Sequence, residues 1–271
     1  IKVDFHIHSV GSKYKDHAKV KNLTIENIGI LIDKLNENNV NMCAITDHDN
    51  FEFDIYKKLK NEEGKGSIQK VLPGVEFSVL FEEKVIHIIV VFDDSDEEKL
   101  KNVHQILFNG TERPAYDNVD KQAYTEKRFL EIIKEINLSN IMIAHQKGTL
   151  SSEKKPRKND VLSLGKEKME ELIFVDYFDS FEFKDRKNEI FNKNYLEKNK
   201  QKFKKNDIRF ITGSDCHDWK MYPEDDNFKY TYLKCLPTFR GISMAITNYT
   251  RIKYVNSFFT VSNKVIDNIE L

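Results

Sequence analysis

The sequence has little cysteine, almost no net charge and no long hydrophobic run. Its 271 residues include three cysteines, Cys43, Cys216 and Cys235, a scattered and odd-numbered set that fits a reducing compartment rather than a disulfide framework. The 43 basic and 44 acidic residues leave a formal net charge of −1, so no overall field marks the chain as a nucleic-acid or membrane protein. No run of about 18 apolar residues is present, which argues against a membrane-spanning helix. We therefore expect a cytoplasmic protein.

The chain also lacks a Gly/Ser-rich or Pro-rich linker and an internal repeat of fixed period. With 39% hydrophobic residues, a chain of this length can bury about three-quarters of the surface that its unfolded form exposes. We therefore predict one folded domain over residues 1–247. We expect the C-terminal segment, residues 248–271, to lead toward a domain outside this chain.

Short β-branched runs alternate with helical patterns along the sequence, which predicts an α/β fold. In the helix expected after Thr24, apolar residues recur every three to four positions. Short apolar strands separated by helices predict a parallel sheet, and this many units favours a closed barrel over an open sheet. Strands are expected at 3–7, 42–46, up to about 76, 85–92, 141–144, 174–178 and 208–212, and a further helix at 126–136.

Histidines and carboxylates occur where the predicted strands stop. The first strand ends in His6-Ile7-His8, and a spacing of two along a strand turns both imidazoles to one face, where they can chelate one ion. In a parallel barrel the carboxyl ends of all strands open on the same face, so residues far apart in the sequence converge there. Later strands are followed by Asp47-His48, by His145, and by Asp215 and His217.

Glu76, in the segment Pro73-Gly74-Val75-Glu76, and His87, within an apolar strand, bring the set to six histidines and two or three carboxylates. One ion cannot use so many ligands. A mixed imidazole and carboxylate set of this size suits two or three divalent ions of the Zn, Mn or Fe type. The absence of clustered thiolates argues against a structural zinc finger.

Several of these residues also have an alternative interpretation. His87 could be a buried core histidine, because its neighbours are aliphatic, and Glu76 could form only a salt bridge. Asp47 could be a turn residue or a partner that orients an imidazole, and we favour the orienting role over direct binding of an ion. His104 stands among polar residues of an expected helix, so we predict it at the surface. Cys216 is predicted to pack rather than to act as a nucleophile.

Six motifs stand in order along the chain: His6-Ile7-His8-Ser9, Thr46-Asp47-His48, Pro73-Gly74-Val75-Glu76, His87, Ala144-His145 and Gly213-Ser214-Asp215-Cys216-His217. This ordered set resembles the polymerase-and-histidinol-phosphatase (PHP) superfamily of metal-dependent phosphoesterases. The resemblance spans residues 6–217, about four-fifths of the chain. It implies a distorted seven-stranded (β/α) barrel with a trinuclear metal site.

The resemblance also implies which residues hold each ion: His6, His8, Glu76 and Asp215 for the first, Glu76, His87 and His145 for the second, and His48 and His217 for the third. The family supplies one more ligand for the third ion shortly after the first motif. The loop from Ser9 to His17 offers both Asp16 and His17 for this role, and we choose Asp16.

The chain departs from the family pattern near His145, which is followed by Gln146-Lys147 instead of the more usual proline. Lys147 therefore places a cation beside the expected site, where it could contact a substrate phosphate, as could Arg113 and Lys184. The Cys-Pro-His segment associated with histidinol phosphatases is absent, which argues against that substrate. The groups expected to protonate the leaving oxygen are a water on the third ion, or Asp47 or His217 acting indirectly.

A second resemblance concerns the end of the chain. The segments 230–234, 237–241 and 245–246 with Arg251 resemble the end of the PHP domain in proteins that fuse it to a large SMC- or AAA-like ATPase. Several such fusions belong to bacterial antiviral defence. No G-x-x-x-x-G-K-[ST] loop occurs here, so any ATPase partner is expected beyond Leu271 or in another subunit.

Together these features predict a metal-dependent hydrolase of phosphoesters that acts on nucleic acid or a nucleotide. Two Lys-rich segments, 147–168 and 184–206, are either solvated faces or a surface that follows phosphates. The alternatives are a small-molecule phosphomonoesterase and a non-catalytic, metal-stabilised assembly module. An amidohydrolase that cleaves C–N bonds is less favoured, because a glutamate takes the expected bridging position. The oligomeric state is left open.

Overall fold

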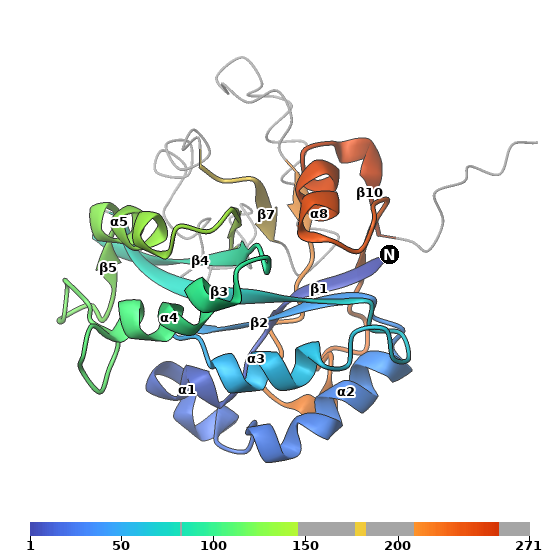
Figure 1. Cartoon of the computed structure of the whole chain (residues 1–271), viewed down its shortest axis with the longest axis horizontal. Helices are drawn as coiled ribbons and strands as arrows, with labels where there is room; N and C mark the ends of the chain where they lie inside the picture. The colour runs from blue at the N-terminus through green and yellow to red at the C-terminus, as the bar shows by residue number, and fades with distance from the viewer. Residues whose placement is uncertain (82, 146–176, 183–208, 255–271) are drawn as a thin grey trace, which may run out of the picture.

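The computed structural model describes residues 1–81, 83–145, 177–182 and 209–254. These residues form one mixed sheet with helices packed against it (Figure 1). The helices are α1 (Lys13–Val20), α2 (Ile28–Glu37), α3 (Phe53–Lys60), α4 (Glu97–Phe108), α5 (Glu126–Ile136) and α8 (Phe239–Ile246), with 3-10 turns η1 (Val10–Ser12), η2 (Ile25–Asn27), η5 (Trp219–Met221) and η6 (Tyr249–Arg251). The strands are β1 (Lys2–Ile7), β2 (Met42–His48), β3 (Lys70–Phe81), β4 (Lys84–Phe92), β5 (Tyr124–Thr125), β6 (Asn140–Ala144), β7 (Ser180–Glu182), β8 (Phe210–Ile211), β9 (Thr231–Leu233) and β10 (Ile252–Lys253).

The strand order is β10-β9-β1-β2-β3-β4-β6-β7-β8, with β5 paired to β3. Beyond β8 the chain returns to β1, where Asp215 N–H donates to the carbonyl of His6 and His8 N–H donates to the carbonyl of Cys216. These hydrogen bonds join the two sides of the sheet into a nearly closed barrel. The predicted α/β barrel is therefore confirmed, and its sheet continues through β10, past residue 247.

The prediction of a parallel sheet is wrong at β4, which runs antiparallel to both β3 and β6, and at β9, which runs antiparallel to both β1 and β10. The third strand also does not end near Glu76: it continues to Phe81 and pairs with β4 from Gly74 to Phe81. Because β4 runs in the opposite direction, its beginning lies level with the carboxyl ends of its neighbours. His87, opposite Ser78, therefore reaches the same end of the barrel as the residues that follow β2 and β6.

Two apolar clusters lie on the two sides of the sheet. The outer cluster joins the strands to helices α2 to α5. The inner cluster fills the barrel and is closed at one end by α8, whose Ile242 is fully buried. The strand residues of the inner cluster are Val3, Phe5, Met42, Ala44, Leu72, Ile89, Val91, Ile141, Ile143, Ile211, Leu233 and Ile252.

The alternation of side chains along the strands places several polar residues on the inner face of the barrel. Four polar residues lie two or four positions along the chain from a residue of the inner cluster: His48 from Ala44, Glu76 from Leu72, His87 from Ile89, and His145 from Ile143. Successive side chains point to opposite faces, so all four turn inward. They form a polar layer above the apolar filling of the barrel.

In β1 this alternation is interrupted. Val3 and Phe5 belong to the inner cluster, whereas Ile7 belongs to the outer one, and the pairing with β2 shifts register between Asp4 and Ile7. A register shift of this kind re-aims the side chains that follow it. The irregularity therefore turns His6 and His8 toward the interior, beside the other polar residues.

Most local predictions agree with the structure. The helix at 126–136 is confirmed as α5, with Thr125 as its side-chain N-cap, and the helix after Thr24 is confirmed as η2 and α2. The strand predicted at 174–178 is misplaced in its described part, because 177–178 are not strand and β7 begins at Ser180. Residues 174–176 and 208 of the two predicted strands lie outside the described residues, as do both Lys-rich segments over their whole length.

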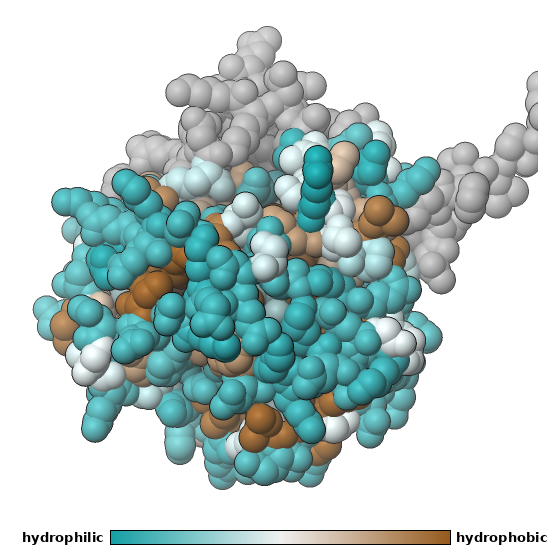
Figure 2. Space-filling model, in the orientation of Figure 1, coloured by the Kyte–Doolittle hydropathy of each residue, from teal (hydrophilic) through white to brown (hydrophobic). Residues whose placement is uncertain are grey.

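The outer face that Figure 2 presents is largely hydrophilic, with scattered apolar side chains. In the same orientation, α2 and α3 run along one side of the sheet and α8 lies on the other (Figure 1). None of the helices in the described ranges is sufficiently long and apolar to cross a bilayer.

We predict that Ile242→Ala lowers the free energy of unfolding by about 2–5 kcal/mol, because it opens a cavity where α8 closes the barrel. Met244→Ala on the same helix, at a side chain that is 55% exposed, should change it by about 0.5 kcal/mol or less. Urea unfolding of both variants measures the difference. Equal changes in the free energy of unfolding for the two variants would contradict the conclusion that Ile242 packs inside the barrel where α8 closes it.

Candidate metal centre

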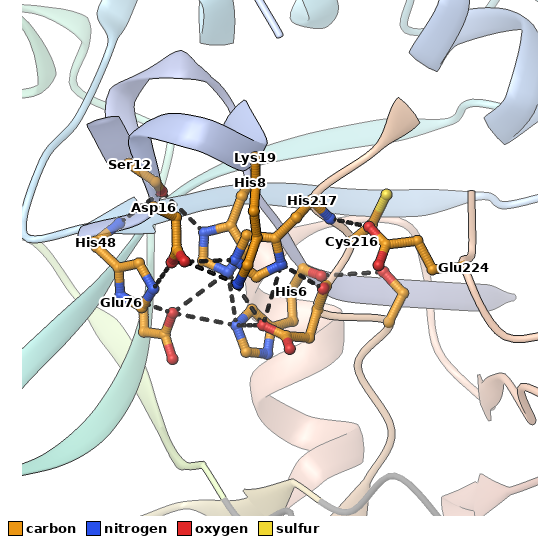
Figure 3. Close-up of polar contacts among 12 residues, drawn as sticks. His6, His8, Ser12, Asp16, Lys19, His48, Glu76, Cys216, His217 and Glu224 are labelled. Carbon is orange, nitrogen blue, oxygen red and sulfur yellow. Dashed lines mark hydrogen bonds and ion pairs between the residues drawn. The ribbon is translucent and has the colours of Figure 1, made fainter. Parts of the chain in front are cut away.

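Four ligand atoms from three separate parts of the chain meet at the polar end of the barrel. His6 Nε2 lies 3.2 Å from His8 Nε2, 3.2 Å from Glu76 Oε2 and 3.2 Å from Asp215 Oδ1. His8 Nε2 lies 3.4 Å from the same glutamate oxygen and 3.2 Å from the same aspartate oxygen. Atoms that share one cation at about 2.0–2.2 Å are roughly 3–3.6 Å apart, so this spacing suits a single ion. Figure 3 shows His6, His8 and Glu76 directed toward one another.

The hydrogen bonds of His8 show which of its nitrogens is available. Ser12 Oγ donates its one proton to Asp47 Oδ1 at 2.8 Å, so it must accept from His8 Nδ1, which lies 2.9 Å away. His8 Nδ1 is therefore the protonated nitrogen. In the neutral ring, Nε2 then presents a lone pair to the carboxylates of Glu76 and Asp215, which are acceptors as well.

His217 has the same arrangement. Its Nδ1 donates to the backbone carbonyl of Asp215 at 2.8 Å, which leaves Nε2 as the acceptor in the neutral ring. That atom faces Asp16 Oδ2 at 3.3 Å. Two acceptors at this distance need a proton or a cation between them. His48 Nε2 approaches the same oxygen at 3.1 Å, so one carboxylate oxygen of Asp16 faces both histidines.

Glu76 joins these groups to the remaining histidines. Its Oε2 faces His6, His8 and His48, the last at 3.1 Å from Nδ1. Its Oε1 lies 2.7 Å from His145 Nδ1 and 3.1 Å from His87 Nδ1. One buried carboxylate therefore contacts five imidazoles. Its two oxygens face different histidines, as a bridge between two ions requires.

The backbone explains why Asp16 rather than His17 reaches this cluster. Asp16 departs from helical geometry within α1, with φ −125° and ψ 33°, and its carboxylate turns toward His48 and His217. His17 is exposed. Lys19 Nζ donates to Asp16 Oδ1 at 2.8 Å, and its side chain is 61% exposed. The side chain of Asp16 is 19% exposed, so the cluster meets solvent on this side.

The pKa values reflect this crowding. Burial opposes a charge on His6, but the carboxylates of Glu182 and Glu76 outweigh it and raise the pKa of His6 to about 9. Burial and the neighbouring rings of His217 and His48 hold the pKa of His8 well below its usual range. Burial also opposes a charge on Glu76, yet the surrounding imidazoles hold the pKa of its carboxyl well below the usual range. The carboxylate is thus ionised and needs positive charge around it.

The donor set fits divalent ions. Within the described residues, His48 Nδ1, Glu76 Oε2 and His217 Nε2 are buried and make no hydrogen bond, although each lies near other ligand atoms. Imidazole nitrogens and carboxylate oxygens are the ligands that Zn, Mn and Fe accept. The groups able to hold an ion are His6, His8, Glu76 and Asp215; His8, His48 and His217; His48, Glu76 and His87; and His6, His145 and Glu182.

Sequence reasoning missed Glu182, which ends the three-residue strand β7 and is buried beside His6. It follows Asp179-Ser180-Phe181, whereas His145 follows an apolar run, so a single glutamate after so short a strand gives little signal. Sequence reasoning also missed Ser12, which links His8 to Asp47. That contact depends on the turn η1, which no periodicity predicts.

The other candidate residues occupy varied positions. Asp47 points to the outer face of β2 and accepts from the backbone N–H and hydroxyl of Ser9 and from Ser12, so it meets His8 only through Ser12. Cys216 is buried, and burial raises the pKa of its thiol, as suits a packing residue. His104 is only partly exposed, because its ring stacks on Phe108. Arg113 is exposed, and Lys147 and Lys184 lie outside the described residues.

No family model matches the chain, and no curated protein matches it significantly. PsfC from Pseudomonas syringae PB-5123 superposes with a TM-score of 0.50 at 17% identity, over 94% of this chain and 91% of that chain. A proposed metal-dependent phosphoesterase from Bifidobacterium adolescentis gives a TM-score of 0.50 at 12% identity, over 90% and 95% of the two chains. An amidohydrolase from Chromobacterium violaceum, solved with sulfate and no metal, gives only 0.42 at 14% identity, over 80% and 88%, which supports no conclusion. At such identities, the first two likenesses establish a shared fold.

We predict that Gly213→Ala destabilises the protein by about 1–3 kcal/mol, because the added Cβ would overlap the Glu182 carboxylate and His6 Cβ. Gly29→Ala, on the exposed side of α2, meets nothing within 4 Å and should stabilise the protein by up to about 1 kcal/mol. Thermal unfolding compares the two. A Gly213→Ala variant with the same thermal stability as the wild type would show that Gly213 does not pack this closely against Glu182 and His6.

We also predict that Asp16→Ala binds one divalent ion fewer than the wild type, since it removes the carboxylate that faces His48 and His217. His17→Ala, a change at the adjacent exposed position, should leave the number unchanged. Metal content after equilibrium dialysis, measured by mass spectrometry, gives the stoichiometry. Loss of an ion from His17→Ala alone would assign the ligand to the other residue.

Proposed function

We propose that this chain is a metal-dependent hydrolase that cleaves phosphoester bonds in nucleic acid or nucleotides. The observation that carries the proposal is the set of ligand atoms from His6, His8, Glu76 and Asp215 at mutual distances suited to one ion. The second oxygen of Glu76 faces His87 and His145, which suits a second ion nearby. The order of the motifs and the fold shared with a proposed phosphoesterase support the same reaction class.

In this proposal the first ion is held by His6, His8, Glu76 and Asp215, and the second by Glu76, His87 and His145. Asp16, His48 and His217 would hold a third. When bound, two ions that share a bridging ligand supply Lewis-acid activation of a water and neutralise charge on the phosphoryl group. The protein contributes the positions of these ligands and a site that is largely closed to bulk water.

Groups at the solvent side would meet the substrate. The side chain of His217 is 11% exposed, its Nδ1 donates to the carbonyl of Asp215 and its Nε2 faces Asp16. Neither nitrogen is therefore free to give a proton, and His217 would assist the leaving oxygen only indirectly, as a ligand of the third ion. Lys19 brings a positive charge to the same side, next to Asp16, where a phosphate could contact it. Asp47 would act only by orienting His8 through Ser12, and Lys147 stays a candidate phosphate contact.

Nucleic acid or a nucleotide is preferred because of the two Lys-rich segments, 147–168 and 184–206. An ATPase domain or subunit that acts together with this chain is part of the same proposal, supported by the resemblance of residues 230–251. In the described residues this stretch forms β9 and α8, with Ala245 and Ile246 in the inner cluster, so it contributes to the barrel as well.

With Mn²⁺, we predict that the wild type hydrolyses at least one of single-stranded DNA, plasmid, RNA, a nucleotide or a chromogenic phosphoester. Asp215→Asn should reduce that rate at least about 100-fold, because it weakens the first ion site while nearly preserving shape. Asp218→Asn is the matched control: this exposed residue caps η5, asparagine caps equally well, and activity should be unchanged.

The substrate panel separates the alternatives. Hydrolysis of the chromogenic phosphomonoester alone would favour a small-molecule phosphatase over a nuclease. A wild type that binds its ions but releases nothing from any phosphoester would contradict the enzyme proposal and favour an assembly module.

A further inference from the structure

We propose that Glu182 is a positioning residue that holds His6 with Nε2 directed at the first ion, a role that rests on the proposed function. Glu182 belongs to none of the motifs in the sequence. It comes from β7, which is separated from β1 by β2, β3, β4 and β6 in the strand order, and closure of the barrel brings its carboxylate to the Nδ1 edge of His6.

The contact is close and fully buried. His6 Nδ1 lies 2.8 Å from one carboxylate oxygen of Glu182 and 3.0 Å from the other. The exposed fractions of the two side chains are 0% and 2%. Nδ1 therefore carries the proton and donates it to this carboxylate, which leaves Nε2 of the neutral ring free to bind a cation.

The opposite edge of the His6 ring faces only ligand atoms. Nε2 is 3.2 Å from each of Glu76 Oε2, Asp215 Oδ1 and His8 Nε2. The imidazole thus stands between Glu182 on one side and the first ion group on the other. A carboxylate that accepts from the outer nitrogen of a ligand histidine fixes the orientation of the ring and makes it a stronger ligand.

The surrounding chain makes room for this carboxylate. Gly213 packs so closely that a Cβ there would overlap both Glu182 and His6, and glycine is the residue that avoids this. Glu182 Oε1 also lies 3.6 Å from His145 Nε2, whose other nitrogen contacts Glu76. Glu182 is therefore placed to orient two of the histidines that surround Glu76.

His8 and His217 have neutral oxygen acceptors at the corresponding nitrogen: a serine hydroxyl for His8 and a backbone carbonyl for His217. His6 alone among these three has a carboxylate there. A charged acceptor forms the stronger hydrogen bond. Removal of Glu182 should therefore affect the first ion more than the ions held by the other histidines.

The test is isothermal titration of the metal-free protein with Mn²⁺ and with Zn²⁺. Glu182→Ala should weaken the site that contains His6 about 10–100-fold and leave the number of ions at saturation unchanged. Glu182→Gln should recover much of the affinity, because its amide oxygen can accept the same proton from Nδ1. Glu63→Gln is the matched control: this carboxylate accepts from the backbone N–H of Val71, near the start of β3 and before Glu76 in that strand, and its loss should not alter metal binding.

The outcomes are distinct. Loss of a whole ion from Glu182→Ala would overturn the positioning role, because it would make Glu182 a direct ligand together with His145. Unchanged affinity in both Glu182 variants would overturn it too, whatever the thermal stability of the metal-free protein. A wild type that binds no cation would instead contradict the proposed function itself.

Discussion

The polar end of the barrel depends on the burial of one ionised carboxylate, Glu76, among five imidazoles. A carboxylate taken out of water is strongly destabilised unless positive charge or hydrogen-bond donors surround it. The side chain of Glu76 has no exposed area, and its two oxygens divide the histidines between them. Protons on the imidazoles can satisfy it in part, and divalent ions between the same atoms satisfy it more fully.

Much of this centre could be predicted from the sequence, because strand periodicity and barrel topology decide where polar residues converge. His48, His145 and Asp215 were found by their positions after strands. His87 was found as a lone polar residue in an apolar run, although the antiparallel direction of β4, which brings it to the rim, gave no local signal. Glu182 was missed for a different reason, since its role arises only from the contact between β7 and β1.

The groups that contact the outer nitrogens of three histidines follow one pattern. Ser12, the carbonyl of Asp215 and Glu182 each accept from an Nδ1, on His8, His217 and His6 respectively. The same nitrogen, Nε2, is thereby left facing the cluster in all three rings. The backbone contributes as well: the register shift in β1 turns two histidines inward, and Asp215 is held with φ at +55°, a conformation that non-glycine residues seldom adopt outside special sites.

The most direct test of this account is a crystal structure of the protein grown with Mn²⁺ or Zn²⁺, with anomalous diffraction used to locate the ions. The account predicts a peak at about 2.0–2.3 Å from His6 Nε2, His8 Nε2 and the carboxylates of Glu76 and Asp215. It also predicts a second peak on the other oxygen of Glu76. Ions found only elsewhere on the molecule, with Glu76 balanced by protonated histidines alone, would contradict it.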